Sequence, residues 1–114
     1  FLPRRSDSAE FPLADTPCEL LSRCKPNQPL TLTLGGTVLT AENARLHIQP
    51  VLGQDAADAH LDVNEPIRVI LDRGVIEVFA NGGTFWAALE AEGDLLTKTI
   101  SIAGAEGLKV YPLH

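Results

Sequence analysis

Residues 67–90 read IRVILDRGVIEVFANGGTFWAALE and predict two β-hairpins that share a central strand. Apolar residues recur at every second position before and after Gly74, which is the pattern of strands with one buried face. Pairing Leu71 with Ile76 gathers these residues on one face, whereas a slip by one residue would bury the carboxylate of Glu77. Gly74 is expected to supply the positive φ of the tight turn. The predicted apolar face consists of Ile67, Val69, Leu71, Ile76, Val78 and Ala80.

The second turn is predicted at residues 81–83, which read Asn-Gly-Gly. Asn-Gly between apolar runs is a strong hairpin signal. The length of the turn stays open, because residues 85–88 do not alternate. A two-residue turn would place Trp86 opposite Glu77, and a three-residue turn would place it opposite Val78 on the buried face.

The rest of the chain also has the pattern of short strands separated by turns. Strands are predicted at residues 30–34, 37–40, 45–49, 95–102 and 107–112. Residues 53–60 lack apolar periodicity and are predicted to form a loop. These elements predict an all-β fold in which two antiparallel sheets pack as a sandwich of the jelly-roll or concanavalin-like kind.

The 114 residues fit one domain. Prolines punctuate the start of the chain, so residues 1–17 are predicted to be an extended lead-in and residues 18–114 a single sandwich. Methionine is absent, including at position 1, and we expect the chain to be a piece of a longer polypeptide. A formal net charge of −6 argues against a nucleic-acid partner. No apolar run is long enough to cross a membrane, so no membrane partner is expected.

The run at residues 71–83 resembles a signature of the C-terminal β-sandwich of family-32 glycoside hydrolases, which include invertases, inulinases and levanases. The family's run is typically Asp-Arg-Ser-Ser-Val-Glu-Val-Phe followed by a turn that contains Asn or Gly. Gly74 departs from the usual serine, and residues 108–112 are similar to the family's closing strand. The residues that match the run and its turn are Asp72, Arg73, Glu77, Val78, Phe79, Asn81 and Gly82.

This resemblance implies a non-catalytic module that packs on a separate catalytic propeller of the same polypeptide. Such a module would support stability, homodimer formation or the substrate cleft. The implied reaction of the whole protein is hydrolysis of β-fructofuranosyl bonds in sucrose or fructans with retention, which requires two carboxyl groups about 5–5.5 Å apart. None of the family's three acidic motifs occurs in this sequence. No catalytic, metal-binding or cofactor-binding residue is therefore assigned, and no cofactor is expected.

Several residues have a structural and a functional interpretation. Asp72 and Glu77 are expected to form ion pairs with Arg68 and Arg73 or to stabilise the turn, rather than to act in catalysis. Trp86 is expected in the core or in an interface, with stacking on a sugar as the alternative. A free-standing carbohydrate-binding module and a protein-interaction sandwich without a sugar role are the two other functions considered.

Other polar residues are interpreted as structural. His47 and His60 are expected to face solvent. The carboxylates of residues 55, 58 and 62 form an acidic loop that lacks the glycine and final glutamate of a calcium site. Cys18 and Cys24 are expected to be free thiols, because six residues of extended strand separate their Cα atoms by about 20 Å.

Overall fold

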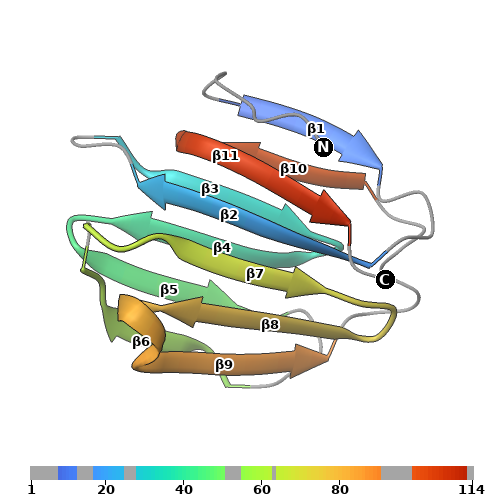
Figure 1. Ribbon diagram of the computed structural model, residues 1–114. Coiled ribbons are helices and arrows are strands. Elements are labelled where there is room, and N and C mark those ends of the chain that lie inside the picture. The colour runs from blue at the N-terminus through green and yellow to red at the C-terminus, as the bar shows by residue number, and fades with distance from the viewer. Residues whose placement is uncertain are drawn as a thin grey trace.

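The computed structural model describes residues 8–12, 17–24, 28–50, 55–62, 64–90 and 99–112. They form two antiparallel sheets that lie one on the other, as Figure 1 shows. The all-β sandwich predicted from the sequence is confirmed. Within these ranges, no helix combines the length and apolar character needed to cross a membrane.

One sheet has six strands and the other has five. The six-stranded sheet has the order β1 (Ser8–Pro12), β10 (Thr99–Ala103), β3 (Leu30–Leu34), β4 (Thr37–Glu42), β5 (Arg45–Gln49) and β6 (Ala57–His60). The five-stranded sheet has the order β11 (Ala105–Pro112), β2 (Cys18–Cys24), β7 (Ile67–Leu71), β8 (Val75–Ala80) and β9 (Phe85–Glu90).

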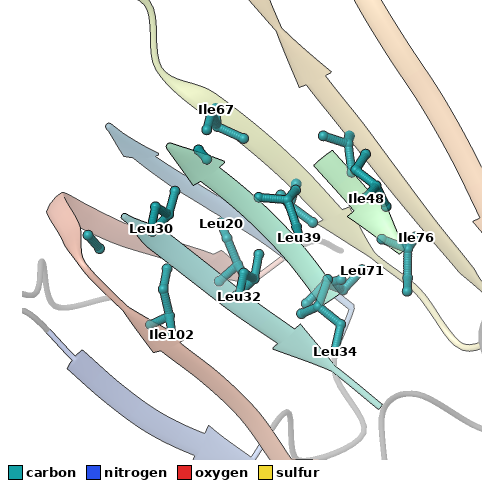
Figure 2. Close-up of a cluster of buried hydrophobic side chains, with 14 of the residues drawn as sticks. Leu20, Leu30, Leu32, Leu34, Leu39, Ile48, Ile67, Leu71, Ile76 and Ile102 are labelled. Atoms are coloured by element: carbon teal, nitrogen blue, oxygen red, sulfur yellow. The ribbon is translucent and has the colours of Figure 1, made fainter. Parts of the chain in front are cut away.

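The core lies between the two sheets, where alternate residues of every central strand are buried. Figure 2 shows leucines and isoleucines of β3, β4, β5 and β10 meeting those of β2, β7 and β8. The largest side chains that are almost fully buried are Leu20, Leu30, Leu34, Leu39, Leu46, Ile48, Leu61, Leu71, Ile76 and Ile100. Neither sheet could bury its apolar face alone, so the two faces stabilise each other.

The predicted register of β7 and β8 is confirmed. Leu71 pairs with Ile76, and Val69 pairs with Val78. All six side chains of the predicted apolar face are at most 3% exposed. The alternation is decisive here because a slip by one residue would bring Glu77 into the core.

The prediction for Gly74 is wrong. The φ angle of Gly74 lies outside the left-handed region, and a Cβ atom at this position would meet nothing within 4 Å. The backbone N–H of Asp72 donates to the carbonyl of Val75 at 3.0 Å, and the Asp72 carboxylate accepts the N–H of Arg73 at 2.7 Å. These two bonds shape the turn in place of a glycine-specific backbone conformation.

Both predicted registers of the second hairpin are wrong, because the turn has four residues. Ala80 pairs with Phe85, and Phe79 pairs with Trp86. Residues 81–83 have left-handed φ angles of 57°, 66° and 93°. Thr84 completes the turn by donating its N–H to the Asn81 carbonyl at 3.3 Å. The longer turn places Trp86 on the outer face of the sheet, 59% exposed, so its expected place in the core is also wrong.

Residues 57–60 form strand β6 instead of the predicted loop, whereas residues 53–54 lie outside the described part. Half-buried Ala57 and Ala59 alternate with exposed Asp58 and His60, and Ala57 packs against the core. The alternation is therefore present, but its apolar members are alanines. A search for large apolar residues misses such an edge strand.

The outer strands also differ in extent from the prediction. Strand β10 begins at Thr99, and residues 95–98 of the predicted strand lie outside the described part. Strand β11 begins at Ala105 rather than Gly107, and its pairing with β2 contains a bulge between Glu106 and Lys109. Within the predicted lead-in, β1 pairs with β10 at the edge of the six-stranded sheet. The boundary between lead-in and sandwich stays a prediction.

Candidate functional site

The residues that match the family signature lie in three different environments. Asp72 and Arg73 are exposed at the tip of the β7–β8 hairpin. Val78 is fully buried, because it points toward the opposite sheet. Glu77 and Phe79 point outward and are half-buried. The signature therefore contains a turn, a core residue and an outer surface, rather than one cluster of reactive groups.

Asn81 ties the β8–β9 turn to the other sheet. Its side-chain amide donates to the carbonyl of His60 at 2.7 Å, and its side-chain oxygen accepts the backbone N–H of Asp62 at 2.6 Å. His60 ends β6, and the N–H of Leu61 donates to the Ala44 carbonyl at 2.8 Å. The Asn81 carboxamide thus connects the five-stranded sheet to the end of the six-stranded sheet. Gly82 follows with a left-handed φ of 66°.

We expect Asn81→Ala to lower the free energy of unfolding by about 2–4 kcal/mol. Two hydrogen bonds of about 0.5–1.5 kcal/mol each would be lost, and alanine is less favourable than asparagine at a left-handed φ. Urea unfolding followed by far-UV circular dichroism measures this change. Asn81→Gly is the matched control, since glycine accepts the φ but has no carboxamide. A glycine variant as stable as the wild type would show that the contact between the sheets contributes nothing.

The outer face of the five-stranded sheet has a connected row of side chains. The Arg68 Nε donates to the Glu19 Oε2 at 2.7 Å, and its guanidinium carbon lies 5.7 Å from the centre of the Phe79 ring. Phe79 lies directly opposite Trp86, whose indole N–H donates to the Glu77 Oε2 at 3.3 Å. We call these five residues the aromatic row. Its aromatic rings are thereby held by an ion pair, a cation–π contact and a hydrogen bond.

The ion pair expected between Glu77 and Arg68 is not formed, whereas Asp72 stabilises its turn, which was the alternative expectation. Arg68 pairs with Glu19 on the neighbouring strand β2, and Glu77 accepts from Trp86. Periodicity within the hairpin could not reveal the Arg68–Glu19 pair, because 49 residues separate its members. The contacts of Asp72 and Glu77 support a structural role for both carboxylates. Their assignment as signature residues without catalytic function stays a prediction.

The outer face of the six-stranded sheet has different chemistry. His47 and Asp58 face each other across β5 and β6, and the His47 Nδ1 lies 2.8 Å from the Asp58 Oδ1. The Asp62 carboxylate accepts the backbone N–H of Asn64 at 3.0 Å. Asp55 and His60 are exposed. Across the described ranges, no three His, Cys, Asp or Glu side chains form a group that could hold a metal ion.

Two adjoining hollows lie at one end of the five-stranded sheet and share Leu21 and Pro66. The first, of about 280 Å³, is lined by Leu21, Ser22, Arg23, Pro66, Glu106, Gly107 and Lys109. The second, of about 260 Å³, is lined by Leu21, Glu65, Pro66, Arg68, Phe79, Ala80, Gly82 and Gly83. Glu106 and Lys109, which flank the bulge in β11, both line the first hollow. Trp86 lines neither of these two hollows, whereas Arg68 and Phe79 of the aromatic row line the second.

The two cysteines lie at opposite ends of β2 and carry thiols rather than a disulfide. Cys18 is buried, whereas Cys24 is half-buried. Burial raises the pKa of Cys18 to about 11. Burial also raises the pKa of Cys24, although the backbone at Leu30 opposes this effect. Thiolates are the reactive form of cysteine, so Cys18 is held in its unreactive form at neutral pH.

The raised pKa of Cys18 predicts a loss of stability at alkaline pH. An unfolded thiol releases its proton near pH 9, whereas the folded state keeps it up to about pH 11. The unfolded state therefore binds fewer protons in this window, and the free energy of unfolding falls as pH rises, by about 1–3 kcal/mol. Unfolding curves at pH 8 and pH 11 should show this fall in the wild type. In Cys18→Val it should be smaller by that amount, and equal falls in the two proteins would contradict the prediction.

Comparison with known proteins identifies the fold. A scan against protein-family models finds no match, and a search of the curated proteins finds none either. Among solved structures, the chain matches exo-inulinase from Aspergillus awamori with a TM-score of 0.72 at 12% identity, covering 99% of this chain and 29% of the enzyme. This chain and the matched part of the exo-inulinase share the sandwich fold. The match to the GH32 β-fructofuranosidase of Bombyx mori has a TM-score of 0.65 at 14% identity and covers 96% of this chain and 25% of that enzyme.

A second group of similar structures consists of proteins that are nearly all sandwich. A double mutant of congerin II matches with a TM-score of 0.62 at 12% identity, covering 94% of this chain and 100% of congerin. Congerin II liganded with lactose and MES matches with a TM-score of 0.57 at 11% identity and the same coverage. The chain thus spans less than a third of the two hydrolases but the whole length of congerin II.

Proposed function

We propose that this chain is a non-catalytic β-sandwich module of a β-fructosidase-type glycoside hydrolase, and that it packs against a separate catalytic domain of the same polypeptide. The observation that carries the proposal is a match over 99% of the chain to 29% of an exo-inulinase. The signature-like run on β7 and β8 supports the proposal independently of the fold, since the resemblance lies in the sequence. The hydrogen bonds of Asp72 and Glu77 also support a structural role for the run.

The parent reaction in this proposal is hydrolysis of β-fructofuranosyl bonds with retention. Fructose release from sucrose and from inulin tests it in two proteins: the complete polypeptide that contains this chain, and residues 1–114 alone. We expect release only by the complete polypeptide, with β-fructofuranose as the first anomer seen by NMR. Release by residues 1–114 would contradict the non-catalytic role. A complete polypeptide that hydrolyses neither substrate would contradict the parent activity.

The second candidate is a free-standing carbohydrate-binding module. It is favoured by the 59% exposure of Trp86 and by the match to all of congerin II, of which one structure holds lactose. An exposed aromatic ring can stack on a sugar. Isothermal titration with inulin, sucrose and lactose distinguishes the candidates. Saturable heat of sugar binding that disappears in Trp86→Ala would favour this second function. A protein-interaction sandwich without a sugar role would give no such heat and would bind a protein partner or a second copy of itself.

A further inference from the structure

The two outer faces of the sandwich differ in the apolar surface they expose. In the part of the chain that the structure describes, all three large apolar residues that are exposed lie on the five-stranded face: Val75 is 42%, Trp86 59% and Tyr111 41% exposed. The opposite outer face carries mainly hydroxyl, imidazole, amide and charged groups. The outward residues there include Thr31, Thr33, Thr40, Arg45, His47, Gln49 and Asp58. Val75 and Trp86 lie on the adjacent strands β8 and β9, whereas Tyr111 lies on β11 at the opposite edge of the sheet. The β8–β9 part of this face is therefore the part suited to an interaction.

The charged groups in the aromatic row already have partners. Arg68 is paired with Glu19, and Glu77 accepts from Trp86. When a partner removes water from this face, Arg68 stays paired with Glu19, and Glu77 keeps the hydrogen bond from the indole N–H. Trp86 and Phe79 are also held by neighbouring side chains, so little conformational freedom is lost when they are covered. Fixed aromatic residues of this kind are typical of the central contacts of protein interfaces.

These features fit a protein surface better than a sugar. A sugar site is usually a concave pocket with polar groups free to bind hydroxyls. Trp86 lies outside both hollows, and Ala88, two residues further along β9, adds no polar group. The neighbours of Trp86 on this face are Phe79 and Ala88, and the Glu77 carboxylate already accepts the indole N–H.

We propose that the outer face of the five-stranded sheet, centred on Phe79 and Trp86, is the surface that packs against the catalytic domain of the same polypeptide. This assignment rests on the proposed function. The choice of occupant follows from the hydrolase matches, in which the sandwich makes up 25–29% of a longer chain. A domain linked in the same chain is present at high effective concentration, so a surface of modest extent is sufficient to hold it.

Two cysteine variants of the complete, active polypeptide test the surface. Ala88→Cys lies on the five-stranded face, and Ala103→Cys is the matched control on the six-stranded face; both alanines are exposed in this chain. Each variant is reacted with a maleimide, and peptide mass spectrometry separates the new thiol from Cys18 and Cys24. We expect the thiol at position 88 to react at least about tenfold more slowly than that at position 103. In 8 M urea (about the concentration that unfolds most domains) the two rates should become equal.

Oxidative footprinting of the wild-type polypeptide provides a measurement without substitutions. Trp86 should be oxidised at least about tenfold more slowly in the native than in the unfolded polypeptide, whereas His47 should differ little. Equal reactivity at positions 88 and 103, with sucrose or inulin still hydrolysed, would overturn the surface and leave the proposed function intact. A polypeptide that hydrolyses neither substrate would overturn both. If Trp86 were protected only at high protein concentration, the face would be assigned to a second copy of the protein. If it were protected only after inulin is added, the face would be assigned to a sugar. Either result would overturn the proposal.

Discussion

Gly104→Ala is expected to lower the free energy of unfolding by more than about 4 kcal/mol, which is enough to unfold most of a marginally stable domain. Gly104 joins β10 to β11 and so carries the chain from one sheet to the other. Its φ is +80°, and a Cβ atom there would lie 1.9 Å from the backbone oxygen of Pro29. The obstacle is backbone at the start of β3, which cannot move without disturbing strand pairing. Urea unfolding and the yield of soluble protein measure the effect.

Gly107→Ala is the matched control for this prediction. Gly107 also has a left-handed φ, of +64°, but a Cβ atom at this position would meet nothing within 4 Å. Its substitution should therefore cost only the left-handed backbone strain, about 1–2 kcal/mol. The difference between the two variants isolates the collision with Pro29. If both variants unfolded at the same urea concentration, that collision would have no energetic consequence.

Ile76→Ala is expected to lower the free energy of unfolding by about 2–5 kcal/mol. The Ile76 side chain is fully buried between the two sheets, where it pairs with Leu71 and Leu89 on neighbouring strands. Its truncation removes apolar contacts and leaves a cavity that close-packed neighbours fill only in part. The midpoint of urea unfolding reports the loss.

Val75→Ala is the control for the core prediction, since Val75 precedes Ile76 on β8 but points to the outer face and is 42% exposed. In residues 1–114 alone, its truncation should change the free energy of unfolding by less than about 0.5 kcal/mol. If Val75→Ala and Ile76→Ala lowered the free energy of unfolding by similar amounts, the assignment of one buried and one outer face to β8 would be contradicted. A larger effect of Val75→Ala in the complete polypeptide would agree with a docked outer face.

The turn at residues 81–84 is a feature whose position the local sequence predicted but whose length it did not. Asn-Gly-Gly predicted a reversal correctly, but three successive left-handed residues and Thr84 made it one residue longer than the longest predicted turn. In a strand, one extra residue moves every following side chain to the other face. Compared with the three-residue turn, the observed turn moves Trp86 from the buried face to the outer surface, where it forms part of the aromatic row.

The fold class and the β7–β8 register could be derived from the sequence, because a slip by one residue would bury Glu77 and the short turn leaves little room for a larger slip. The aromatic row and the Asn81 link depend on another kind of information. Arg68 meets Glu19 across 49 residues, and Asn81 reaches His60 across 21. Such contacts arise only when hydrophobic burial has stacked the sheets and brought distant strands side by side, so no periodicity along the chain encodes them.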